Sequence, residues 1–272
     1  MSANTLPYLA EVAEEEASGE IARIYAEIRR LTGVPFVALV YRHLATVPQA
    51  LEGLWRLVAP LLLSGDLQEC AWRMSRDAWT ASVPDLPRNV AALGEAELSR
   101  IADVIAAYNR ANPVNFAIVS VIGAPSPTFV TAREPSGAVW IPPPALRSLP
   151  PIPPVGDLPP EVRTLVDAFG KRGPGGNSIL VPTLYRHLAH WPGFLALAQR
   201  EVLPRVAGGA FQPMIDAFRI GMQREAAVFA SDRAMASDPL LGVAAPVLER
   251  FAGVIPEMVV VGSFLSRILA RP

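Results

Sequence analysis

One short segment occurs twice in this 272-residue chain, and it limits the possible folds more than any other feature. Residues 40–60 read VYRHLATVPQALEGLWRLVAP, and residues 184–204 read LYRHLAHWPGFLALAQREVLP. At a constant offset of 144, the two segments agree at ten of twenty-one positions, beginning with a shared Tyr-Arg-His-Leu-Ala. Chance would give about one or two matches, so the sequence predicts an internal duplication.

Helical periodicity surrounds both copies. Residues 18–31 and 158–170 each place apolar side chains on one helical stripe that ends at a glycine. Each copy then continues past a proline into a further helix. A third helix is expected at 66–82, capped by Asp66, with a counterpart at 212–231.

A fourth helix is expected to begin near residue 94. We expect Pro113 to interrupt it, as Pro256 does in the second half, because proline removes a backbone donor and clashes with the preceding turn.

A proline-rich stretch separates the two halves. It contains IPPPALRSLPPIPP, which favours an extended polyproline segment over a helix. No strand-like alternation recurs in the sequence. We therefore predict an all-α fold with a first helical repeat at 1–124, a linker at 125–157 and a second repeat at 158–272, packed about a pseudo-twofold axis.

Composition narrows the class of protein. With 24 basic and 25 acidic residues, the net charge of −1 favours neither nucleic acid nor an anionic membrane as partner. The single cysteine, Cys70, permits no intrachain disulfide. The N-terminal residues lack the pattern of a signal peptide, and the apolar runs at 117–122 and 258–261 are too short to cross a bilayer. We expect a cytoplasmic protein and leave a homodimer open.

Several motifs together resemble a known family. They are SGEI…IY…IR…VPFVALVYRHLATVP, then YNRANPVNFAIVSVIGA, then the proline-rich bridge and LYRHLAHWP. This layout resembles the group I 2-haloacid dehalogenases over about residues 7–268. The resemblance implies two helical repeats with the active site between them, and hydrolysis of 2-haloalkanoic acids by an activated water that attacks C2. It implies no metal and no organic cofactor.

The half-unit is also similar to the alkylhydroperoxidase and carboxymuconolactone decarboxylase fold, without that family's Cys-x-x-Cys pair.

The resemblance assigns pocket positions residue by residue. Its water-positioning asparagine falls on Asn112, which is retained, and a pocket tyrosine becomes Asn115. Of two pocket aromatics, Phe36 is kept and Leu39 is aliphatic. The serine before the catalytic carboxylate becomes Thr183.

The catalytic aspartate of the family falls on Leu184. A water that attacks C2 must lose a proton, and leucine has no lone pair to accept it. Asp216, Glu225 or Glu257 could replace the missing acid only through tertiary contacts. We therefore expect ordinary 2-haloacid dehalogenation to be absent or feeble.

A comparison of the two halves also points to these positions. Asn112 aligns with Ile255, Asn115 with Met258, and Thr183 with Leu39, so polar groups in one half replace apolar ones in the other. Glu257 likewise aligns with Val114. Asn112 also precedes Pro113, where it would suit the cap of a helix, so the cap and the pocket role are both open.

The repeated Tyr-Arg-His motif has more than one reading. His187 and His190 lie three residues apart, which suits a metal site, but the third histidine, His43, lies in the other half. Arg42 and Arg186, with the adjacent Tyr41 and Tyr185, could hold a substrate carboxylate. Because the motif is duplicated, a role in helix packing is favoured.

The remaining motifs favour structural roles. We assign Cys70 to a buried position and the tryptophans to core or interface positions: Trp55, Trp72, Trp79 and Trp191. The segment GPGGNS at 173–178 lacks the strand and the Lys-Ser/Thr of a phosphate loop, so we expect a turn that brings Asn177 and Ser178 to the mouth of the cleft.

We expect a small-molecule enzyme on a dehalogenase-like hydrolase scaffold, with an apolar cleft between the repeats. Its ligand would be a hydrophobic small molecule or a small organic acid. The predicted substrate-binding residues are Phe36, Leu39, Asn112, Asn115, Thr183 and Leu184, with Asn112 the one candidate for a catalytic role. The alternatives are a non-catalytic binding protein that keeps the cleft, and an interaction module whose proline-rich linker binds a partner domain.

Overall fold

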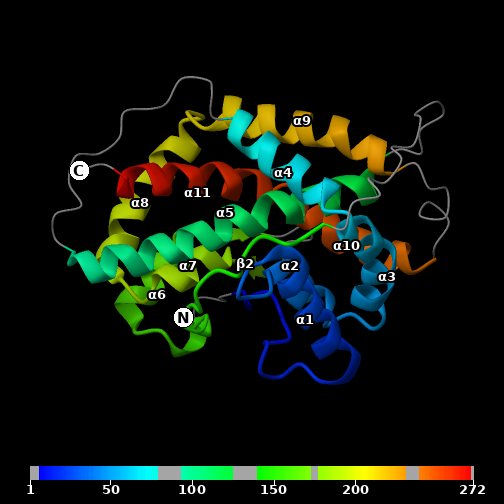
Figure 1. Ribbon diagram of the computed structural model, residues 1–272. Helices are drawn as coiled ribbons and strands as arrows, with labels where there is room; N and C mark the ends of the chain where they lie inside the picture. Colours follow the sequence, from blue (N-terminus) through cyan, green and yellow to red (C-terminus); the bar gives the residue numbers. More distant parts are fainter. Residues whose placement is uncertain (1–5, 79–92, 125–139, 173–176, 231–238, 271–272) are drawn as a thin grey trace.

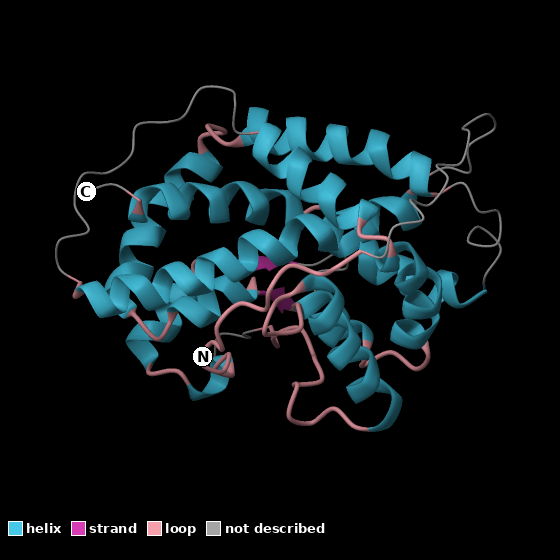
Figure 2. Cartoon of the chain, in the orientation of Figure 1, coloured by secondary structure: helices cyan, strands magenta, loops and turns pink. Residues whose placement is uncertain are grey.

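The described part of the chain is mostly helical, as predicted. The computed structural model describes residues 6–78, 93–124, 140–172, 177–230 and 239–270. Within these ranges, the only strands are β1 (Lys171–Arg172) and β2 (Ile179–Leu180), which pair antiparallel (Figure 2). The all-α class is therefore confirmed.

The described residues of the first half form five helices whose places match the predicted ones. They are α1 (Gly19–Thr32), α2 (Leu39–Leu44), α3 (Ala50–Leu63), α4 (Asp66–Asp77) and α5 (Glu95–Gly123). The predicted stripe of the first helix is largely buried, because Ile24, Tyr25, Ile28 and Leu31 all face the core. Gly33 ends α1 in the left-handed conformation that glycine adopts without strain.

The second half follows a similar order after a short 3-10 turn, η1 (Val155–Asp157). Its helices are α6 (Pro160–Asp167), α7 (Thr183–Leu188), α8 (Pro192–Ala207), α9 (Gln212–Phe229), α10 (Pro239–Ala252) and α11 (Ile255–Leu269). The helices α2 and α7 contain the two Tyr-Arg-His copies and have the same length of six residues.

Two predictions about helix boundaries are wrong. Pro113 does not interrupt the fourth helix, because α5 continues through it. Packing against helices on several sides offsets a cost of about 3 kcal/mol for an internal proline. The second-half counterpart of this helix is divided between α10 and α11.

Asp66 is not the cap of α4, because Gly65 holds that position in the left-handed conformation. The end predicted for this helix, with Trp79, lies outside the described residues.

The helices of the two halves are interleaved around α5. Figure 1 shows α11 running beside α5, with α4 and α9 above them. Within the described residues, α5 packs on α4, α7, α9, α10 and α11, and α10 also packs on α2 and α3. The buried core is consequently shared between the halves.

The described part of the linker is irregular and is bound to the helices. Residues 140–154 contain no helix or strand, as predicted for this composition. Arg110 on α5 donates from Nη1 to the carbonyl oxygens of Gly33 (2.9 Å) and Pro144 (2.7 Å). The linker is thereby fixed along the surface of α5.

One helical stretch, Gly242–Leu269, is long and apolar enough to cross a membrane by length and composition. It joins most of α10 to α11, and more than half of its most apolar window is buried inside the protein. Core helices of globular proteins pass the same test, so this feature is weak evidence for a membrane span.

Candidate functional site

A small pocket lies where α2, α5, α7 and α11 meet. We call it the central pocket; its volume is about 40 Å³, enough for one or two water molecules. Its walls are mostly apolar and come from both halves: Ala38, Leu39, Val40, Tyr108, Asn112, Asn115, Leu180, Pro182, Thr183, Leu184, Phe251, Val254, Ile255 and Met258.

Positions that correspond between the halves line this pocket in pairs. At an offset of 144, the pairs 38/182, 39/183 and 40/184 all line it. At an offset of 143, so do the pairs 108/251, 112/255 and 115/258. This pattern is what a pocket on a pseudo-twofold axis would produce.

Five of the six predicted site residues line the central pocket: Leu39, Asn112, Asn115, Thr183 and Leu184. Leu184 is fully buried and Thr183 is 5% exposed. The sixth, Phe36, is not among the lining residues but packs behind them, with its ring centroid 4.5 Å from that of Tyr108.

The two asparagines are held differently. The Tyr41 hydroxyl donates to Oδ1 of Asn115 at 3.0 Å, and both residues are buried. Asn112 lies in the middle of α5, so its predicted role as a helix cap is wrong. Its amide instead belongs to the pocket wall, where it is 9% exposed.

Tyr108 connects the pocket to a buried histidine. Its hydroxyl lies 3.1 Å from Nδ1 of His187, whose Nε2 lies 2.6 Å from the carbonyl oxygen of Pro150. Because a carbonyl oxygen only accepts, Nε2 carries the proton, and Nδ1 accepts from Tyr108. Burial lowers the pKa of His187 to about 4, so its imidazole is neutral at neutral pH.

None of the three candidate acids lines the central pocket. Asp216 pairs with Arg219, Glu225 pairs with Arg73 at 3.4 Å, and Glu257 pairs with Lys171. None of the lining residues is acidic or basic.

The arginines of the repeated motif converge on one carboxylate. Arg42 and Arg186 lie 2.9 Å and 2.8 Å from the same oxygen of Glu11. All three side chains are largely buried, and none of them lines the central pocket. This geometry favours the packing role over a substrate contact, and Tyr185 likewise stacks on Phe169 at 3.6 Å.

The histidines of the motif contact backbone carbonyls. His43 Nδ1 lies 2.6 Å from the Ala10 oxygen, and His190 Nε2 lies 2.9 Å from the Pro151 oxygen. Among the described residues, no group of three or more His, Cys, Asp or Glu is placed to hold a metal ion.

The structure also places Cys70, Trp55 and part of the glycine-rich turn. Burial raises the pKa of the Cys70 thiol to about 11, which does not suit a nucleophile. Trp55 is buried, as expected of a core residue. Of the glycine-rich turn, residues 173–176 lie outside the described part, and neither Asn177 nor Ser178 lines the central pocket.

Sequence reasoning missed Tyr108 and Phe251. The signal was available, because these two positions align at the same offset as Asn112 with Ile255. Residues such as Leu180 and Val254 gave no signal, since an apolar wall residue looks like any other core residue.

Comparisons with known proteins identify relatives by sequence and by fold. No family model matches the chain. A configuration-inverting 2-haloacid dehalogenase from Alcaligenes xylosoxydans xylosoxydans is 26% identical over 218 residues, which cover 74% of this chain and 70% of that protein.

Solved structures with the same fold include a D-2-haloacid dehalogenase mutant in complex with D-2-CPA, with a TM-score of 0.70, 16% identity and 97% of each chain covered. A D-2-haloacid dehalogenase with L-LA gives a TM-score of 0.69, 15% identity and 98% coverage of each chain. The resemblance to the 2-haloacid dehalogenases is confirmed.

Proposed function

We propose that this relative of the 2-haloacid dehalogenases is a small-molecule enzyme whose ligand site is the central pocket, and that conventional hydrolysis of 2-haloacids is lost or feeble. The proposal includes the two-repeat organisation, with the pocket on the axis between the repeats. The six pairs of corresponding positions that line one pocket support that organisation.

The observation that carries the proposal is the environment of Leu184. This side chain is fully buried in the pocket wall at the position that the resemblance assigns to the catalytic acid. No lining residue supplies a carboxylate, and the three candidate acids are paired elsewhere. Loss of a general base typically lowers a rate by about 10²–10⁴.

The remaining polar groups define what the pocket can hold. The amides of Asn112 and Asn115 and the hydroxyls of Tyr108 and Thr183 offer hydrogen bonds within otherwise apolar walls. The lining contains no cation, so the pocket suits a neutral or weakly polar small molecule better than a free carboxylate. Because the pocket holds only one or two waters, any larger ligand requires the walls to move.

In this pocket, the Tyr108–His187 pair would accept a proton from a ligand. The Nδ1 lone pair of His187 already accepts from Tyr108, and the Tyr108 oxygen can accept from a ligand. The lowered pKa of His187 keeps that nitrogen unprotonated at neutral pH, and it also makes the imidazole a weaker base.

The second candidate is a binding protein that retained the pocket without turnover. The absence of a carboxylate from the pocket wall favours it. A ligand that binds in the pocket and is released unchanged would identify this function.

The test is restoration of the acid. We expect the purified protein to release little chloride from 2-chloropropionate, and Leu184→Asp to increase that release. Leu184→Asn is the matched control, since it has the size and polarity of aspartate without its basicity, and we expect no increase. Circular dichroism checks that both variants fold. Clear chloride release by the wild type that Asn112→Ala abolishes would contradict the proposal.

A further inference from the structure

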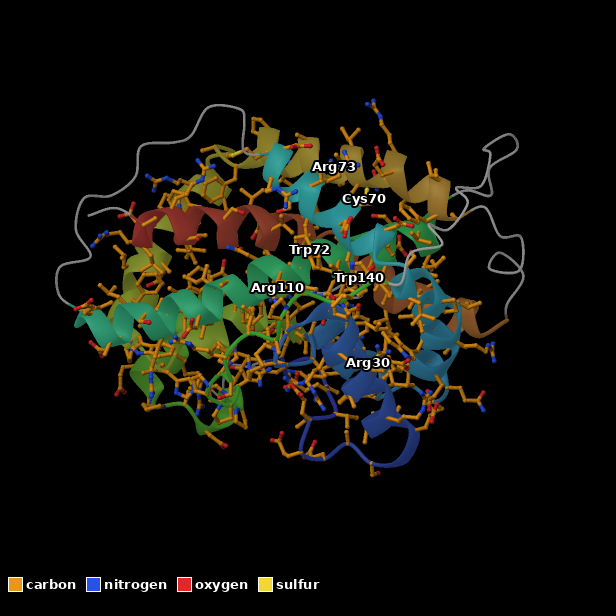
Figure 3. All side chains as sticks on the ribbon, viewed as in Figure 1. Arg30, Cys70, Trp72, Arg73, Arg110 and Trp140 are labelled. Carbon is orange, nitrogen blue, oxygen red and sulfur yellow. The ribbon has the colours of Figure 1, made fainter. Side chains whose placement is uncertain are left out.

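A second pocket, much larger than the first, opens on the surface beside α4, α5 and α11. We call it the arginine pocket, and its volume of about 580 Å³ lies within the usual range for sites of small molecules. Its lining residues are Trp72, Ser75, Arg76, Ala106, Asn109, Arg110, Pro143, Ser263, Ser266 and Arg267. Figure 3 labels Trp72 and Arg110 on this face.

Each of the three helices presents one face to this pocket. The lining positions are 72, 75 and 76 on α4, 106, 109 and 110 on α5, and 263, 266 and 267 on α11, a spacing that repeats as i, i+3 and i+4. Residues at this spacing share one side of a helix. The pocket is therefore built mainly by the packing of three helices, and the linker adds Pro143 to its wall.

The chemistry of the arginine pocket is that of an anion site. Each helix contributes one guanidinium, from Arg76, Arg110 and Arg267. Serine hydroxyls and the Asn109 amide add neutral groups, and none of the ten lining residues is acidic. Guanidiniums on three sides of one cavity offer several donors to a multiply charged anion.

Two of the lining side chains are already held in place. Arg110 donates from Nη1 to two backbone oxygens, which fixes its guanidinium at the pocket wall. Trp72 donates from Nε1 to the Arg110 carbonyl oxygen at 2.9 Å, so its ring is fixed beside the arginine. Side chains ordered before binding lose less entropy when a ligand arrives.

A matched cavity, the twin pocket, is lined by residues of both halves and has a volume of about 540 Å³. Its lining includes Ser120, Gly123, Ala124, Glu249 and Ala252. At the offset of 143, these correspond to Ser263, Ser266, Arg267, Ala106 and Asn109 of the arginine pocket.

The twin pocket contains none of the guanidiniums. Ala124 stands where the first cavity has Arg267, and Gly253 corresponds to Arg110. At the offset of 146 that aligns Trp72 with Phe218, Met222 corresponds to Arg76. The fold therefore forms this cavity without arginines, and helix packing alone does not explain the three that gather in one copy.

We propose that the arginine pocket binds the phosphate group of a small organic phosphate, with the organic part against Trp72. A phosphate monoester carries nearly two negative charges and three terminal oxygens, which suits three guanidiniums better than a single carboxylate does. The indole ring offers an apolar face to the organic part. The proposal is independent of the function proposed for the central pocket.

The test uses phenyl phosphate as the probe and isothermal titration calorimetry as the measurement. We expect phenyl phosphate to bind and its Kd to rise with ionic strength, while benzoate and phenol bind at least about tenfold more weakly. Arg76→Gln and Arg267→Gln should each raise the Kd for phenyl phosphate about tenfold. Glu249→Gln, in the twin pocket, should leave it unchanged.

Three outcomes would overturn the proposal. These are no binding of phenyl phosphate at millimolar concentration, equal binding of benzoate, or a Kd that neither arginine variant changes. Thermal unfolding of each variant confirms that it is folded, and two separate arginine variants keep the test decisive if one of them is unstable. Arg110 is not used, because its bonds to Gly33 and Pro144 make it structural.

Discussion

His187 combines three roles in one buried side chain. It accepts from Tyr108 at the wall of the central pocket, donates to Pro150 of the linker, and lies one helical turn beyond Leu184 on α7. Its ring also meets that of Phe36 edge-on at 6.1 Å. The site, the linker and the predicted aromatic residue therefore depend on one neutral imidazole.

Protonation of His187 should destabilise the fold. Its pKa is about 4 in the folded protein against about 6.5 in an unfolded chain, so below pH 6.5 the unfolded state binds a proton that the folded state does not. The free energy of unfolding should fall as the pH drops from 6.5 to 4, by about 3 kcal/mol from this group. We expect His187→Gln to lose less stability over this range in urea titrations. An equal loss in both proteins would contradict the assignment.

Single residues were partly predictable from the sequence. Five pocket residues were found, because the resemblance and the comparison of the halves both pointed to them. Glu11 was not found, although it pairs with both Arg42 and Arg186. It lies in the acidic run EVAEEEASGE, which resembles a solvent-exposed segment until the tertiary fold brings the two arginines to it.

At the scale of elements, the described part of the linker is bound to the helices more closely than its composition alone indicates. Arg186 Nε donates to the Pro153 oxygen at 3.1 Å, and His190 meets the Pro151 oxygen. These prolines have carbonyl oxygens but no N–H groups, so side chains of α7 and of the turn that follows it satisfy the linker backbone. Sequence patterns predicted the extended form but could not predict which helix would hold it.

The contact between Gly65 and Trp140 fixes the start of the described linker to α4. Gly65 has φ 78°, and an added Cβ would lie 2.1 Å from the Trp140 ring. We expect Gly65→Ala to reduce the free energy of unfolding by at least about 2 kcal/mol, from the left-handed backbone and from the steric clash.

The control for this variant is Gly193→Ala, since Gly193 lies near the start of α8 with nothing within 4 Å of an added Cβ. We expect it to be neutral or slightly stabilising. Urea unfolding of both variants measures the difference, and equal stabilities would show that Gly65 tolerates a side chain.

At the scale of the whole molecule, the two halves are predicted from the sequence as separate repeats but pack as one body. The repeats are predicted because identical residues recur at a constant offset. The packing of second-half helices on first-half helices could not be predicted from the sequence. The periodicity of a helix shows that one face is buried, but not which helix covers that face. Here α10 covers α2 and α3 of the first half, and α9 covers α4.

Neither half should therefore fold alone. A fragment of residues 1–124 would expose the faces of α2, α3, α4 and α5 that second-half helices cover, and would leave Glu11 without Arg186. We expect fragments 1–124 and 158–272 each to lack a cooperative thermal transition, while the full chain unfolds in one transition by circular dichroism and by tryptophan fluorescence. A fragment that unfolds cooperatively by itself, or a full chain with two separate transitions, would show that the shared core contributes little and that the halves are independent domains.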